Sequence, residues 1–179
     1  MSKFTLLFLS SILCSALMAQ RISNNDFKIL QAKEDSMKLY ADKIITGQSM
    51  SIRFNNDSLF TRAFVKALKT PWSFNYPFDS LQTISKIYAP DSSFRIFTWQ
   101  MVVSENLTRQ HGAIQMKTAD GSLKIFPLID KSDVTQNIID TAANNKGWIG
   151  AVYYRIIQKR SSNQNYYTLL GYDENNLKS

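Results

Sequence analysis

The hydrophobic period of the chain changes at Pro71, and this change constrains the fold more than any other feature of the sequence. Before Pro71, apolar residues recur every three or four positions, as they do on one face of a helix. After it, apolar and polar residues mostly alternate in short runs that are separated by turn residues. The sequence therefore predicts an α+β fold in which two helices precede an antiparallel meander of five or six strands.

Two amphipathic segments carry the helical period. The first spans residues 26–45, and Gly47 follows it in the position that helix C-terminal caps prefer. The second is expected to begin at residues 56–58, whose side chains can accept hydrogen bonds from a first helical turn. It should stop near Lys69, because Thr70 precedes a proline. Its apolar stripe consists of Phe60, Ala63, Phe64, Ala67 and Leu68.

Six runs of strand-forming residues follow, at 81–88, 94–103, 110–118, 123–129, 148–159 and 166–172. Asp120-Gly121 is the strongest hairpin signal between them. Residues 134–143 interrupt the series, and we expect a short helix there.

The last two runs predict a hairpin that is apolar on both faces. A turn centred on Asn163 would pair Ile156 with Leu170 on one face and Ile157 with Leu169 on the other. A sheet with one wet face should alternate apolar and polar residues, so both faces are expected to be covered. A curled sheet, a partner chain or further polypeptide could provide the second cover.

The first nineteen residues are typical of a secretory signal peptide. Lys3 supplies a positive start, residues 4–17 are apolar or small, and Ala16 and Ala19 suit a signal peptidase. The apolar run is shorter than the ~20 residues that a membrane-spanning helix needs. Leu13 before Cys14 disfavours lipid attachment. We expect export to the periplasm or the exterior, a single domain over residues 20–179, and a mature chain without cysteine.

Composition excludes several classes of protein. Of 179 residues, 44% are hydrophobic, and the low counts of Gly (6), Pro (4) and Cys (1) exclude collagen-like and disulfide-stapled chains. The net charge of +7 is spread along the chain and does not form the basic patch of a nucleic-acid binder. No transmembrane segment and no nucleic-acid partner are therefore expected.

The inventory of catalytic and metal-binding side chains is thin. His111 is the only histidine, and the chain has no Gly-rich phosphate loop. Residues 173–176 offer oxygen atoms for calcium but lack the spacing of a calcium loop. We therefore expect no metal and no cofactor, and we assign no catalytic residue. The acidic residues lie at predicted turns or element ends, where local backbone hydrogen bonding explains them: Asp79, Asp91, Glu105, Asp130, Asp133 and Asp173.

Aromatic residues give the one candidate binding surface. In an extended segment the rings of residues 72, 74, 76 and 78 would share one side. With a tryptophan of the following strand they could stack against sugar rings, although core or interface packing is the favoured explanation of these rings. The candidate stacking residues are Trp72, Phe74, Tyr76 and Trp99.

Five stretches carry a resemblance to a known group of proteins. They are residues 70–81 (TPWSFNYPFDSL), 90–100 (PDSSFRIFTWQ), 111–115 (HGAIQ), 148–154 (WIGAVYY) and 167–173 (YTLLGYD). Together they resemble functionally uncharacterised exported proteins of Bacteroidota, over roughly residues 55–176. Members of that group often continue past the last stretch, so the chain is expected to be either a natural short form or one truncated at its C-terminus. The resemblance implies bacterial origin and export, and it supplies no activity.

These observations lead to two hypotheses about function. The first is a non-enzymatic domain of the bacterial envelope that binds a partner protein or a polysaccharide through its sheet. The alternative is a carbohydrate-active or other hydrolase that uses turn carboxylates near the aromatic segment. Paired acids in a cleft beside Trp72 or Trp99 would favour the enzyme.

Overall fold

The structure, a computed structural model, describes residues 22–135 and 142–177. The predicted signal peptide and Cys14 lie outside these residues, as does most of the short helix expected at 134–143. The helices are α2 (Asn24–Thr46) and α3 (Met50–Leu68), with short 3-10 helices at η1 (Ser73–Asn75), η2 (Ser132–Val134) and η3 (Glu174–Leu177). The strands are β1 (Ser85–Tyr88), β2 (Phe94–Ser104), β3 (Leu107–Met116), β4 (Lys124–Ile129), β5 (Val152–Ser161) and β6 (Gln164–Tyr172).

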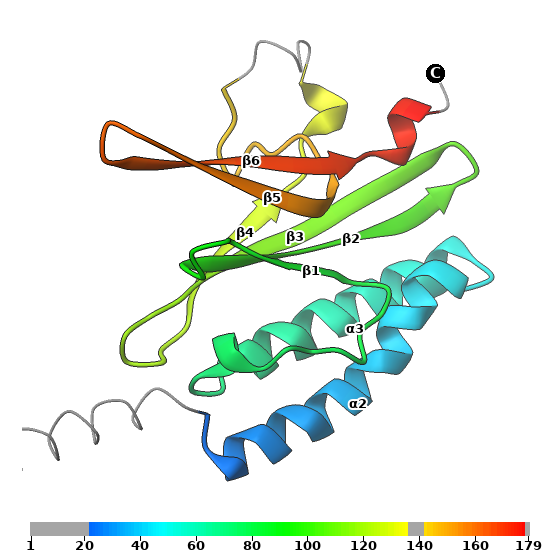
Figure 1. The fold of residues 1–179 in the computed structure, drawn as a ribbon. Coiled ribbons are helices and arrows are strands. Elements are labelled where there is room, and N and C mark those ends of the chain that lie inside the picture. Colours follow the sequence, from blue (N-terminus) through cyan, green and yellow to red (C-terminus); the bar gives the residue numbers. More distant parts are fainter. Residues whose placement is uncertain (1–21, 136–141, 178–179) are drawn as a thin grey trace, which may run out of the picture.

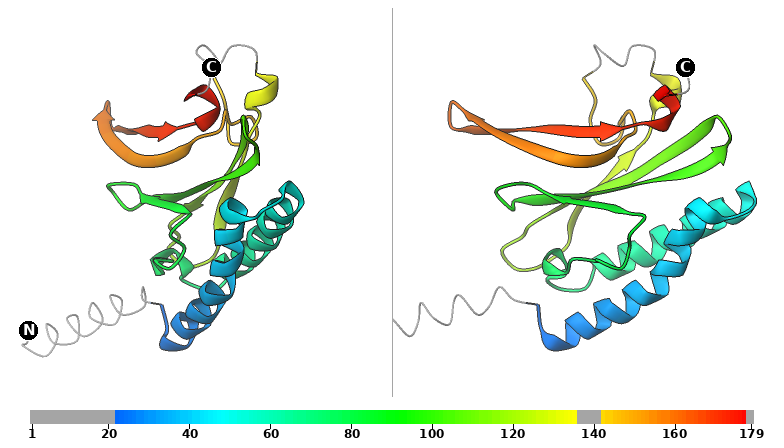
Figure 2. Two further views of the ribbon diagram at one scale, coloured as in Figure 1. Left: turned by 90° about the vertical axis from the view of Figure 1, so that its right-hand side faces the viewer. Right: turned by 45° about the vertical axis from the view of Figure 1, so that its right-hand side comes forward.

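The elements form three layers (Figures 1 and 2). Strands β1-β2-β3-β4 make an antiparallel sheet in chain order, and β5 and β6 form a separate hairpin. The antiparallel helices α2 and α3 cover one face of the four-stranded sheet, and the hairpin crosses the other face, where β5 packs against β1 and β2. The predicted α+β fold is confirmed. Among the described residues, no helix has the length and apolarity needed to span a bilayer.

A serine is the N-cap residue of each of the two α-helices. Ser23 accepts a hydrogen bond from the backbone N–H of Asp26, and Ser49 accepts one from that of Ile52. The predicted start of the second helix at residues 56–58 was wrong, because α3 begins two turns earlier. The side chain of Asp57 instead turns inward and lies 7% exposed.

The core lies between the helices and the sheet. Phe64 of α3 is at its centre, with ring centroids 5.3 Å from Phe60, 5.4 Å from Phe78 and 4.8 Å from Phe97. Such edge and offset contacts stabilise aromatic pairs beyond the area that they bury. The helical residues buried in this core are Leu30, Met37, Ala41 and Ile44 of α2 and Phe60, Phe64, Ala67 and Leu68 of α3.

The aromatic segment after Pro71 is a folded loop, so the prediction of an extended segment was wrong. Trp72 and Phe78 have positive φ angles of 59° and 58°, and η1 lies between them. These left-handed residues turn the chain and prevent the rings from lining up on one side.

A buried arginine holds this loop against the sheet. Arg95 of β2 is 0% exposed and donates hydrogen bonds to the carbonyls of Ser73 and Tyr76 and to the side chains of Gln115 and Tyr88. Burial lowers the pKa of Arg95 to about 10, so the guanidinium keeps its charge at neutral pH. The rings that surround it belong to Phe74, Phe78, Tyr88 and Phe97, at 4.5–5.5 Å from Cζ to each centroid.

The β5–β6 hairpin differs by one residue from the predicted register. A two-residue turn at Ser162 and Asn163, both with positive φ, joins the strands and pairs Ile156 with Leu169. The predicted pairing of Ile156 with Leu170 was wrong. Ile156, 9% exposed, packs inward, while Ile157 on the outer face is 43% exposed. The sheet thus covers one face of the hairpin, and its outer face is exposed in the described structure.

Side chains of the β1–β2 turn fasten the hairpin to the sheet. Asp91 Oδ2 accepts hydrogen bonds from the Tyr167 hydroxyl at 2.7 Å and from Asn165 at 3.3 Å. Its Oδ1 accepts from the hydroxyl of Ser93. Hydrogen bonds from Ser93 and Tyr167 lower the pKa of Asp91.

We expect Asp91→Asn to loosen the hairpin without unfolding the domain. The backbone amides of β6 should exchange faster with deuterium at neutral pH, because Tyr167 loses a charged acceptor. In the unchanged chain the same loosening should occur on acidification. The pKa of Asp91 is lower in the folded state, so its stabilisation is present above about pH 4 and is lost as pH falls through the folded-state pKa.

Asp120→Asn is the matched control for that experiment. Asp120 makes the same local hydrogen bonds to Ser122 but has no contact that fastens the hairpin. Equal exchange rates in β6 for Asp91→Asn and the unchanged chain would contradict the role given to Asp91.

Candidate functional site

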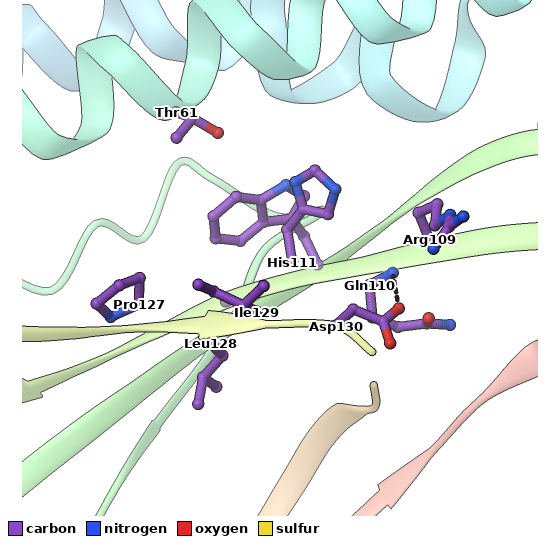
Figure 3. A pocket seen from close by; sticks show the side chains of 10 residues that line it. Thr61, Arg109, Gln110, His111, Pro127, Leu128, Ile129 and Asp130 are labelled. Atoms are coloured by element: carbon purple, nitrogen blue, oxygen red, sulfur yellow. Dashed lines mark hydrogen bonds between the residues drawn. The ribbon is translucent and has the colours of Figure 1, made fainter. Parts of the chain in front are cut away.

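A cavity of about 340 Å³ lies between α3 and the β3–β4 side of the sheet (Figure 3). Thr61 extends into it from α3, opposite His111 of β3 (Figure 3). Apolar side chains from β4 form much of the remaining wall. The lining residues are Thr61, Trp99, Arg109, Gln110, His111, Gly112, Pro127, Leu128, Ile129 and Asp130.

Asp57 organises the aromatic side of this cavity. Its Oδ1 accepts a hydrogen bond from Trp99 Nε1 at 2.8 Å, and its Oδ2 lies 3.1 Å from His111 Nδ1. Trp99 and His111 are Cα partners in the β2–β3 register and lie on the strand face that meets α3. Both side chains can therefore reach the same carboxylate. Asp57 and Thr61 lie one helical turn apart on the facing side of α3.

The contact with Asp57 determines what His111 can do. A neutral imidazole that donates from Nδ1 keeps Nε2 as a hydrogen-bond acceptor. The side chain of His111 is 33% exposed and lines the cavity, so a ligand or water can reach this ring. The arrangement is the one by which a carboxylate orients a histidine as a proton acceptor.

Thr61 supplies the second polar group of the cavity. Its Oγ1 is buried and has no hydrogen-bond partner among the described residues. Buried hydroxyls nearly always have a partner, so this one can turn toward a ligand or a water molecule in the cavity. A histidine ring and an unpartnered hydroxyl therefore lie at one largely apolar cavity.

Charged groups lie at the rim of the cavity. Arg109 Nη2 is 2.9 Å from Asp133 Oδ2, and this hydrogen bond lowers the pKa of Asp133. The carboxylate of Asp130 is held by Ser132, which donates to Oδ1 from both its N–H and its hydroxyl. These contacts leave Asp130 fixed at the end of β4.

The four predicted stacking residues are placed differently from one another. Trp99 lines the cavity, although only 4% of it is exposed. Phe74 and Tyr76 are buried at 9% and 4%, in agreement with the alternative of core packing. Trp72 is half-buried, and its indole lies directly against Gly121. The structure thus brings none of the other three to Trp99 as a shared exposed platform.

Turn chemistry explains several of the acidic residues, as predicted. Asp91, Asp130 and Asp173 each accept a hydrogen bond from the backbone N–H two residues later. Within residues 22–135 and 142–177, no three His, Cys, Asp or Glu side chains lie close enough together to hold a metal ion. The carboxylate that contacts Trp99 is that of Asp57, and both of its oxygens are engaged.

The chain matches no protein-family model, curated protein or solved structure in the comparisons made. The resemblance to exported Bacteroidota proteins therefore stays a prediction.

Sequence reasoning missed Asp57 and Thr61. Asp57 was interpreted as a helix cap, and Thr61 was not considered at all. The spacing of four residues between them, on a helix with its apolar stripe at positions 60, 64, 67 and 68, was the available signal, since it places both at the edge of the buried face.

Proposed function

We propose that this chain is an exported envelope domain that binds a small hydroxylated ligand, such as one residue of a polysaccharide, in the cavity between α3 and β3–β4. One observation carries the proposal. Asp57 engages Trp99 and His111, and His111 lines the same cavity as Thr61, whose hydroxyl has no partner among the described residues.

The size and chemistry of the cavity support a ligand of this class. Ligand sites measure about 300–1,000 Å³ and combine apolar walls with a few placed polar groups. The cavity, at about 340 Å³, is at the lower end of that range and suits a single ring. A ligand hydroxyl can donate to His111 and accept from Thr61, while Ile129, the β4 partner of His111, contacts its apolar side.

A hydrolase is the second candidate, and the Asp57–His111 contact is the observation that favours it. A histidine oriented by a buried carboxylate can take a proton from a water molecule. Thr61 provides the one hydroxyl side chain among the lining residues. In this alternative, His111 Nε2 would act as the base and the Thr61 hydroxyl would orient the water.

Binding to a panel of mono- and oligosaccharides tests the first candidate. We expect one of them to shift the NMR signals of Thr61, His111 and Ile129 in residues 20–179. Thr61→Val should weaken its binding about tenfold or more, because a ligand hydroxyl loses a hydrogen bond. Thr46→Val, at the end of α2 and away from the cavity, is the matched control and should not change affinity.

Two results would decide against this function. Saccharide-induced shifts confined to residues outside the cavity would contradict the site. Release of a cleaved sugar, abolished in His111→Gln, would support the hydrolase instead.

A further inference from the structure

Two neighbouring glutamines on the other face of the sheet have unsatisfied oxygens. Gln100 of β2 and Gln110 of β3 are Cα partners on the strand face opposite the helices. The Oε1 atoms of both are buried and have no hydrogen-bond partner within the described part of the chain. An unsatisfied buried polar atom is costly, and two side by side call for a common explanation.

The amide nitrogens of both glutamines are fixed by acidic residues that follow β6. Gln100 Nε2 donates to Glu174 Oε1 at 3.0 Å, and Gln110 Nε2 donates to Asp173 Oδ1 at 2.7 Å. Two carboxylates from the C-terminal segment therefore lie next to the pair of amides.

A third carboxylate approaches the unsatisfied oxygen of Gln110. A Cβ atom added to Gly150 would lie 2.9 Å from Gln110 Oε1 and 3.0 Å from both carboxylate oxygens of Asp130. These three oxygens converge on the side of Gly150 that carries no side chain, and a Cβ atom there would come too close to all of them. Gln110 is 1% exposed, and its side chain lies beside Asp130 on the side of β3 away from α3 (Figure 3).

Turning the amide of Gln110 does not remove the conflict. The reversed amide would point its nitrogen toward Asp130 but would place its oxygen against Asp173 and the Thr108 hydroxyl, to which the nitrogen now donates at 2.7 and 3.1 Å. In either orientation an amide oxygen faces a carboxylate. Arg109, the adjacent basic residue, is engaged with Asp133.

We propose that a hard divalent cation, Ca²⁺, binds here between β3, the turn after β4 and the segment that follows β6. Its ligands are the Oε1 atoms of Gln110 and Gln100 and the carboxylate of Asp130, with Asp173 or Glu174 adding charge. Calcium takes carboxylate and amide oxygens together in a permissive geometry, whereas Mg²⁺ demands a near-octahedral shell. The two amide oxygens supply neutral ligands in addition to those that the acidic side chains provide. Bound calcium would tie Gly150 and the C-terminal turn to the sheet.

Thermal unfolding of residues 20–179 tests this proposal. Calcium in excess over its dissociation constant by about 100-fold should raise Tm by about 5 °C or more, and EDTA should reverse the rise. Magnesium at the same concentration should have a smaller effect. Terbium luminescence provides an independent readout. The backbone of Trp148 forms an isolated β-bridge with Asp130, so the indole should sensitise terbium bound at this site. Calcium should then lower the signal by displacing terbium.

Matched variants locate the site. Asp130→Asn keeps the size of the side chain and should weaken calcium binding tenfold or more. Asp133→Asn removes an acid three residues away that pairs with Arg109, and it should leave calcium affinity unchanged. Should Asp130→Asn fail to fold, Glu174→Gln provides the same test. An unchanged Tm in 10 mM calcium, or equal losses of affinity in Asp130→Asn and Asp133→Asn, would overturn the proposal and leave a buried water as the partner of the two oxygens.

Discussion

Arg95→Met is expected to lower the free energy of unfolding by about 3–5 kcal/mol, because several buried acceptors lose their donor at once. The carbonyls of Ser73 and Tyr76 and the side-chain oxygen of Gln115 all accept from the guanidinium. Methionine fills much of the same volume and removes a buried charge, but it cannot donate to any of these oxygens. Urea denaturation followed by far-UV circular dichroism measures the change.

Two further variants show whether the loss comes from the hydrogen bonds. Arg95→Lys keeps the charge but brings one nitrogen in place of three, so the domain should still be destabilised. Arg155→Met, on an exposed position of β5, should change stability by less than about 0.5 kcal/mol. A fully stable Arg95→Met chain would show that the loop from Ser73 to Tyr76 does not depend on Arg95.

Asp57→Ala is expected to cost about 2–4 kcal/mol of stability, because the buried indole N–H of Trp99 and the partly exposed ring of His111 lose their shared acceptor. The substitution should also abolish ligand binding, since His111 would no longer be held in one orientation. Stability is measured by urea denaturation, and binding by the NMR titration described above.

The neighbouring acid Asp133 serves as the control. Asp133 forms an exposed pair with Arg109 at the rim of the same cavity, and exposed pairs contribute little. Asp133→Ala should therefore stay within about 0.5 kcal/mol of the unchanged chain. An equal loss in both variants would contradict the organising role of Asp57.

Hydrophobic periodicity was sufficient to predict the layers of this fold. The stripe at Phe60, Phe64 and Leu68 is buried as expected, and each of the six predicted strand runs overlaps a strand. Both signals are local, since they depend on which face of an element is buried. The start of α3 could not be found in this way, because the polar residues at 56–58 suit a helix cap and an inward-facing hydrogen bond equally.

Details that depend on single residues were beyond the sequence. The pairing of Ile156 differs by one residue because the turn uses two residues, and a separate register shift between Tyr153 and Arg155 changes the pairing again farther from the turn. The folded shape of the aromatic loop depends on the positive φ angles of Trp72 and Phe78, which the sequence does not indicate. The candidate site depends on Asp57 meeting Trp99 and His111 across two layers, and no local pattern encodes such a contact between distant segments.

The strand order of the sheet also bears on how the chain folds. Among the strands of residues 22–135 and 142–177, each pairs only with strands next to it in sequence, in the order β1-β2-β3-β4 and then β5-β6. Pairings between consecutive segments close short loops and lose little chain entropy before contacts form. A growing polypeptide can thus complete each pairing as soon as its second strand emerges, so assembly can proceed stepwise from the amino end of the domain.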